Sequence, residues 1–151
     1  METILKRIIL ENQEIIANKQ LISRNYSIPV TDNITVLTGI RRCGKTYMLY
    51  EKAKLINPKC ILFLDFEDER LIALFSLTNY DVIVDAYKML FPNLEPVVFF
   101  DEIQNLPNWH LYLKRLHIKG YKIYVTGSNA HLISREISTF LKGRSLETTI
   151  Y

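Results

Sequence analysis

The sequence predicts an α/β fold with a largely parallel sheet, because short apolar runs alternate with segments of helical periodicity. Its 151 residues, 48% of them hydrophobic and 23% charged, suit one ordinary globular domain.

The net charge of the chain, +3, is too small to indicate nucleic acid, which stays a possible partner without support. No apolar run approaches the ~20 residues of a membrane-spanning helix. Cys43 and Cys60 lack metal-site spacing, so we expect reduced thiols in a cytoplasmic protein without a membrane partner.

Helices are predicted where apolar residues recur with helical spacing. The first helix, over residues 4–17, has an amphipathic pattern that places six apolar residues on one stripe: Ile4, Leu5, Ile8, Ile9, Ile15 and Ile16. A second helix spans 46–56 and stops before Asn57-Pro58, since the residue before proline avoids helical geometry. Further helices are expected over 79–91, 107–119 and 129–142. Thr78 with Asp81 resembles a capping pair for the third. Gly120 and Gly143 end the last two, and the helix over 107–119 is expected to bury Trp109, Tyr112, Leu113 and Leu116.

Strands are predicted from short, continuous apolar runs of the kind found in buried parallel sheets. They cover residues 34–39, 60–66, 97–102, 122–128 and 146–151. The aromatic residues Phe63, Phe66, Phe99, Phe100 and Trp109 fall on the expected core faces. These aromatic side chains are therefore poor candidates for stacking on bases.

The strongest motif is GIRRCGKT at residues 39–46, which fits G-x-x-x-x-G-K-[ST] between a predicted strand and a predicted helix. Gly39 and Gly44 allow a tight turn of backbone N–H groups, and the helix that follows directs its positive end at the same anion. Lys45 would neutralise β- and γ-phosphate oxygens, and Thr46 would complete a Mg²⁺ shell. We expect nucleotide contacts from Gly39, Ile40, Arg41, Arg42, Cys43, Gly44, Lys45, Thr46 and Tyr47.

Some side chains of this loop have two interpretations. Arg41 and Arg42 either attract the anion or a partner, or are solvated. Cys43 is a small residue that fits the loop, or a thiol activated by the helix end.

Asp101 and Glu102 follow four consecutive apolar residues. Asp101 at a strand end can hold Mg²⁺ directly or through water, and Glu102 can orient and polarise an attacking water. The alternative is a pair of capping or turn acids. The upstream loop favours the catalytic interpretation, and a glutamate here suggests hydrolysis over phosphoryl transfer to a metabolite.

Other polar residues follow the remaining strands. Ser128 and Asn129 lie at a strand end, where Asn129 can contact the γ-phosphate or the lytic water, or where either residue caps the next helix. Arg144 can reach a neighbouring subunit's γ-phosphate, or is a solvated loop residue. The acidic cluster after the second strand, Asp65, Glu67 and Asp68, has three interpretations. It helps to arrange the site, it binds Arg41 or Arg42, or it is a polar loop. The polar loop is the favoured interpretation.

Two smaller expectations concern aromatic and basic side chains. Segment 23–33, with Tyr26, is the expected adenine side. His110, His117 and His131 lack metal-ligand spacing, and Arg135 lies within a predicted helix as a solvated or salt-bridged residue.

Four segments, GIRRCGKT, FEDERL, VVFFDEIQNLPNW and YKIYVTGSNAHLISREISTFLKGRSLE, resemble the AAA-type ATPase domain of a widespread prokaryotic P-loop family. The resemblance covers the chain from about Asn18 onward. It implies a three-layer AAA+ core with a five-stranded, mostly parallel sheet of order 5-1-4-3-2, with ATP and Mg²⁺ as ligands. It also implies Walker A at 39–46, Walker B at Asp101 and Glu102, and a sensor at Asn129. The domain organisation that we expect is an N-terminal amphipathic helix at 1–17 followed by the ATPase core at 18–151. Because family members usually continue into a lid and a C-terminal domain, this core is expected to be truncated.

The leading functional hypothesis is an ATPase that hydrolyses ATP with Mg²⁺ to drive or gate a conformational change. The expected catalytic residues are Glu102, Lys45, Asn129 and Arg144. The expected metal ligands are Thr46 and Asp101. The partners of this ATPase would be ATP, a protein of unknown identity and, in a longer form, further copies of itself. A nucleotide-gated module that does not hydrolyse ATP is the alternative. A P-loop kinase is less favoured because no arginine-rich lid segment is present, and a GTPase because no NKxD tetrad is present.

Overall fold

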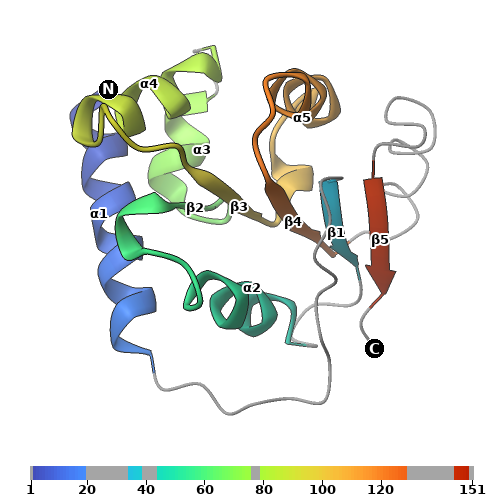
Figure 1. Cartoon of the computed structure of the whole chain (residues 1–151). Coiled ribbons are helices and arrows are strands. Elements are labelled where there is room, and N and C mark those ends of the chain that lie inside the picture. The colour runs from blue at the N-terminus through green and yellow to red at the C-terminus, as the bar shows by residue number, and fades with distance from the viewer. Residues whose placement is uncertain (1, 20–33, 39–43, 76–78, 129–144, 150–151) are drawn as a thin grey trace.

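The computed structural model describes residues 2–19, 34–38, 44–75, 79–128 and 145–149, and the last segment by its backbone alone. Its centre is a parallel sheet whose strands run in the order β2-β3-β4-β1-β5 (Figure 1). The strands are β1 (Ile34–Thr38), β2 (Ile61–Asp65), β3 (Val97–Asp101), β4 (Ile123–Gly127) and β5 (Ser145–Thr149). Every strand pair is parallel, as the sequence predicts, and β1, β4, β3 and β2 have the order that the resemblance implies.

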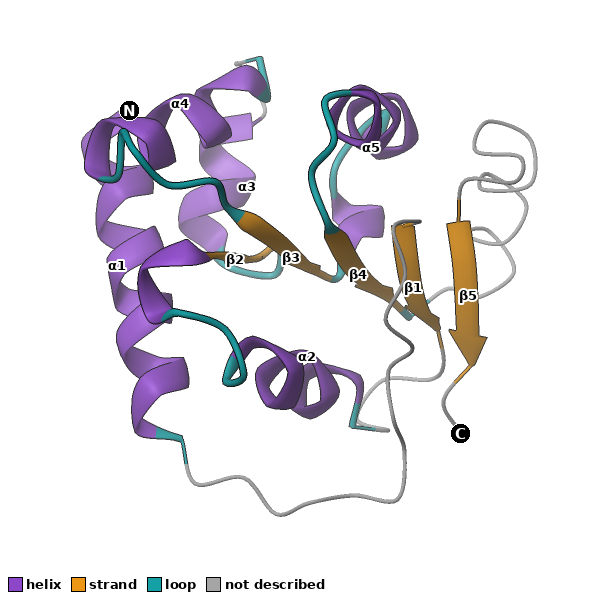
Figure 2. Cartoon of the chain, in the orientation of Figure 1, coloured by secondary structure: helices purple, strands orange, loops and turns teal. Residues whose placement is uncertain are grey.

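Helices cover both faces of this sheet (Figures 1 and 2). On one face lies α2 (Lys45–Ala53). On the other lie α3 (Glu69–Phe75), α4 (Asp81–Leu90) and α5 (Trp109–Ile118). Strand residues alternate between the two layers: Val98 and Phe100 join the core beneath α3 to α5, whereas Phe99 packs with Met48 and Leu49 of α2. The α/β layering is therefore confirmed.

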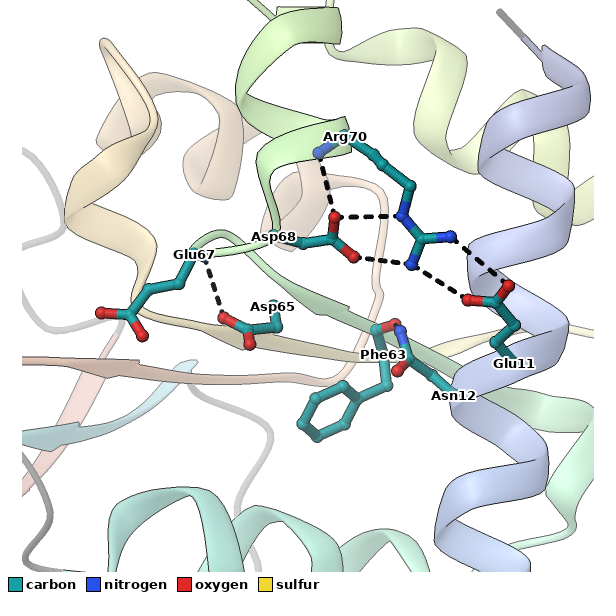
Figure 3. Close-up of polar contacts among 7 residues, drawn as sticks. All are labelled: Glu11, Asn12, Phe63, Asp65, Glu67, Asp68 and Arg70. Carbon is teal, nitrogen blue, oxygen red and sulfur yellow. Dashed lines mark hydrogen bonds and ion pairs between the residues drawn. The ribbon is translucent and has the colours of Figure 1, made fainter.

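The first helix, α1 (Glu2–Asn18), closes the outer edge of β2. Asn12 Nδ2 donates to the Phe63 carbonyl at 2.7 Å (Figure 3), and Gln13 Nε2 donates to the Ile61 carbonyl at 2.9 Å. These amides satisfy carbonyls that an edge strand otherwise exposes. The helix is predicted correctly, but its stripe is narrower than expected. Ile4 and Ile15 are 41% and 46% exposed, because they lie on the flank of the stripe formed by the buried residues Leu5, Ile8, Ile9 and Ile16.

Two helices differ from the sequence prediction. Helix α2 ends at Ala53, not at residue 56, because Asn57 Oδ1 accepts from the Lys59 N–H and starts a 3₁₀ turn, η1 (Pro58–Cys60). Leu55 is 83% exposed, so a longer helix would bury nothing there. Helix α3 is not predicted at all.

Helices α4 and α5 are confirmed. Trp109, Tyr112, Leu113 and Leu116 are buried as predicted. Gly120 ends α5 at φ +91°, in the left-handed region that glycine favours. Asn79 Oδ1 accepts from the Asp81 N–H at the start of α4, whereas the predicted partner Thr78 lies outside the described residues. The predicted helix at 129–142 also lies outside them. Within the described segments, none of the helices has both the length and the apolar character needed to cross a bilayer.

Candidate functional site

The candidate site lies where β1, β3 and β4 end at their carboxyl edge. Gly44 precedes α2 with φ 97° and ψ 11°, a conformation that strains any residue with a Cβ atom. It thus makes the turn predicted for it. Lys45 is the first residue of α2 and only 4% exposed. Residues 39–43, and with them Gly39, Ile40, Arg41, Arg42 and Cys43, lie outside the described residues.

Asp101 ends β3 beside two threonine hydroxyls. Thr46 Oγ1 donates to Asp101 Oδ2 at 2.8 Å, and Thr126 Oγ1 donates to Asp101 Oδ1. Asp101 is 3% exposed. Burial raises the pKa of Asp101 above its ordinary value, and the hydrogen bonds from Thr126 and Thr46 act in the opposite direction. The structure therefore brings together the two predicted metal ligands, Thr46 and Asp101.

Thr126 is a site residue that sequence reasoning missed. Its hydroxyl also accepts from the Glu102 N–H at 2.9 Å, so one buried side chain fixes both acids of the DE pair. The parallel register pairs Phe100 with Val125, which makes Asp101 and Thr126 the next positions on β3 and β4. The sequence carries no specific signal for this role, because it depends on the register of β3 against β4.

Glu102 turns into the left-handed region, with φ 56° and ψ 54°, and is 7% exposed. Ser128 Oγ lies 2.8 and 2.7 Å from its two carboxylate oxygens, and Gln104 Nε2 donates to Oε2 at 2.6 Å. Lys45 Nζ lies 3.5 Å from the same Ser128 Oγ. Lys45, the serine that follows β4 and the second acid of the DE pair therefore lie next to one another.

Asp65 ends β2, and Glu67 and Asp68 lie in the short polar turn between β2 and α3, as the favoured interpretation of the sequence expects. Asp68 Oδ1 accepts from the Arg70 N–H at 3.0 Å at the start of α3. The Arg70 guanidinium joins Asp68 at 2.8 Å to Glu11 of α1 at 2.9 Å (Figure 3). This network connects α3 to α1. Its arginine is Arg70, whereas the suggested partners Arg41 and Arg42 lie outside the described residues.

Asp65 lies closer to the site than Asp68 does. It pairs in register with Asp101, and its Oδ1 accepts from the Glu67 N–H at 2.9 Å. Burial raises the pKa of Asp65 to about 6, and the Asp101 charge adds to this effect while the Glu67 N–H opposes it.

The oxygen ligands that Thr46 and Asp101 offer suit a hard divalent cation whose other ligands are water and phosphate oxygens. Among the described residues, no group of three or more His, Cys, Asp or Glu side chains is placed to hold a metal ion. A carboxylate and a hydroxyl at 2.8 Å separation match Mg²⁺, which binds proteins through one or two carboxylates and takes substrate oxygens as well.

Tyr47 is the remaining predicted site residue within the described part of the chain. It is 43% exposed and packs edge-on against Tyr50, with Lys19 Nζ 5.5 Å from its ring centre. Asn129 and Arg144 lie outside the described residues, as do Tyr26, His131 and Arg135.

Comparison with known proteins places the chain in a family. Residues 31–151 match the AAA domain family. The chain belongs to this family. The AAA domain is 39% identical over 150 residues to the uncharacterized protein MJ1544 of Methanocaldococcus jannaschii, covering 97% of this chain and 33% of that protein. It is 33% identical over 148 residues to an uncharacterized protein of Haemophilus influenzae, covering 89% of this chain and 36% of that protein. The AAA domain thus spans about a third of the length of these relatives.

Two solved structures share the fold of this AAA domain. PCH-2 from C. elegans has a TM-score of 0.56 at 15% identity, covering 99% of this chain and 41% of that one. AMPPCP-bound DnaA from Aquifex aeolicus has a TM-score of 0.50 at 15% identity, covering 96% and 46%. The AAA-type resemblance of the sequence is confirmed.

Proposed function

We propose that this AAA domain binds ATP together with Mg²⁺ and hydrolyses it, and that the cycle drives or gates a conformational change. One observation carries the proposal. Lys45, Thr46, Asp101 and Glu102 converge through hydrogen bonds that involve the hydroxyls of Thr126 in β4 and Ser128 directly after it, at the edge where parallel sheets bind ligands. DnaA, which shares the fold, is AMPPCP-bound. This supports a nucleotide as the ligand here.

Each side chain has one task in the proposal. Lys45, at the start of α2, neutralises β- and γ-phosphate oxygens together with the helix N-terminus. The Thr46 hydroxyl and the Asp101 carboxylate would hold Mg²⁺, which when bound neutralises charge on the same oxygens. Asp101 suits that role because its buried carboxylate accepts hydrogen bonds from the neutral hydroxyls of Thr46 and Thr126.

Glu102 is the general base. It takes a proton from water as the water oxygen bonds to the γ-phosphorus, while the bond to the β–γ bridging oxygen breaks and ADP leaves. Its closeness to Lys45 through Ser128 favours hydrolysis over a switch that only retains ATP. Asn129 as sensor, Arg144 as a contact to a neighbouring copy, and the protein partner remain predictions.

Nucleotide titration and turnover test this function separately. Fluorescent mant-ATP is titrated into the protein with and without Mg²⁺, and phosphate release is measured at saturating ATP. Lys45→Ala is expected to weaken binding at least ~10-fold, because a charge-assisted contact of about 1.5–3 kcal/mol is lost. The matched control is Lys122→Ala, an exposed lysine at the opposite end of β4, which should bind like the parent.

Glu102→Gln keeps the shape of the side chain and removes the base. It is expected to retain mant-ATP affinity and lose turnover. Hydrolysis by Glu102→Gln at the parent rate would show that Glu102 is not the base. Equal binding by Lys45→Ala and the parent would contradict the nucleotide site itself.

A further inference from the structure

The side chain of Gln104 is held in a specific and unfavourable arrangement beside Glu102. It belongs to a 3₁₀ turn, η2 (Ile103–Asn105), that follows directly on Glu102. Its Nε2 donates to Glu102 Oε2 at 2.6 Å, while its Oε1 is buried and has no hydrogen-bond partner among the described residues. An exchange of the amide atoms would set two oxygens against each other, so the bond fixes this orientation.

The turn that carries Gln104 is anchored on both sides. Ile103 and Leu106 are 0% and 3% exposed, and Asn105 Nδ2 donates to the Phe66 carbonyl at 3.2 Å. The backbone of Gln104 is therefore fixed relative to the ends of β2 and β3. Ser128, directly after β4, contacts the Glu102 carboxylate, and Gln104 contacts it from η2. Two neutral donors on separate elements thus restrict where this carboxylate can point.

A buried amide oxygen without a partner destabilises the fold, because it loses its hydrogen bonds to water and gains none. An apolar side chain of the same length would avoid that penalty. A polar residue kept at such a cost is expected where function, not stability, requires it.

We propose that Gln104 is a positioning residue for Glu102: its amide N–H holds the general base in the orientation that meets the attacking water. The inference rests on the proposed hydrolysis. Gln104 makes no contribution to nucleotide affinity in this scheme, so its loss should lower kcat and leave binding unchanged.

Gln104→Met tests this, because methionine is close in length and cannot donate. Phosphate release is expected to fall at least about tenfold, since small misplacements of a catalytic group have large effects on rate. The dissociation constant for mant-ATP should stay within about twofold. The melting temperature should not fall, because the substitution also removes the unpaired oxygen. Gln104→Glu should be slower still, because a second carboxylate would repel Glu102.

Gln13→Met is the matched control. Gln13 is buried, and it donates to the Ile61 carbonyl at the opposite end of β2 from the site. This substitution should lower the melting temperature and leave kcat unchanged, which is the reverse of the pattern expected for Gln104→Met.

The outcomes separate the inference from the function. Normal turnover in Gln104→Met, with an inactive Glu102→Gln, overturns the positioning role and leaves the ATPase proposal standing. A rise in the mant-ATP dissociation constant that accounts for the lost turnover also overturns it. If Glu102→Gln itself hydrolyses ATP normally, the proposed function fails, and the role of Gln104 fails with it.

Discussion

The hydroxyl of Thr126 is the polar contact on which both acids of the site depend. It donates to Asp101 Oδ1 and accepts from the Glu102 N–H at 2.9 Å, on a side chain that is 0% exposed. Thr126→Val replaces this hydroxyl by a methyl group of nearly the same volume. The substitution therefore removes two hydrogen bonds without making a cavity.

The expected loss of stability follows from these contacts. Removing a donor from a charged, buried acceptor costs about 1.5–3 kcal/mol, and an unsatisfied buried N–H costs about 1–3 kcal/mol. The added methyl group offsets about 0.8 kcal/mol. Because adjacent losses are not additive, Thr126→Val should lower the free energy of unfolding by about 2–4 kcal/mol.

Urea unfolding followed by fluorescence provides the assay. Trp109 is the single tryptophan and is 4% exposed in the core, so its emission reports global unfolding. Measurements are made in EDTA without nucleotide, so that ligand binding does not contribute. With an m-value of about 2 kcal/mol/M, the middle of the usual range in urea, the midpoint should fall by about 1–2 M.

Thr35→Val is the matched control on the adjacent strand β1. Thr35 is also 0% exposed, but its Oγ1 has no hydrogen-bond partner among the described residues. The same substitution should there be neutral or stabilising by about 1 kcal/mol. Equal unfolding free energies for the two variants, within about 0.5 kcal/mol, would refute the reasoning.

Three further outcomes are expected. Burial raises the pKa of Asp65 to about 6, above its unfolded value, so the folded state binds that proton more tightly and loses stability as pH rises from about 4 to 6. Asp65→Asn should therefore be more stable than the parent by about 1 kcal/mol at pH 7, after allowance for solvent screening, and lose that advantage at pH 4 in urea titrations. Gly120→Ala meets no atom within 4 Å but keeps φ +91°, so calorimetry should show a loss of about 1 kcal/mol from backbone strain. Arg70→Met breaks an exposed network and should cost less than about 1 kcal/mol, with no cost in 1 M NaCl.

The sheet and most helices are predictable because periodicity is a local property of the chain. Helix α3 is missed for a physical reason: it is seven residues long, Glu69–Phe75, and begins in the acidic run that indicates a loop. Asp68 accepts the Arg70 N–H there as a cap. Leu71 and Phe75, four residues apart, both face the core. That spacing, together with the cap, is the signal that was available.

The candidate site is predictable only in part. Lys45, Thr46, Asp101 and Glu102 follow from spacing, because each belongs to a pattern with a chemical reason. Thr126 does not, since threonine is an ordinary strand residue and Thr35, equally buried, has no such role. What distinguishes them is the register of β3 against β4, a long-range property.

The chemistry of the donors explains why hydroxyls and an amide surround these acids. Thr46 and Thr126 donate to Asp101, and Ser128 and Gln104 donate to Glu102, all as neutral groups. Neutral donors offset part of the desolvation penalty of a buried carboxylate and leave its charge in place. For Asp101 that charge is what Mg²⁺ would bind, and for Glu102 it is what would take the proton from water.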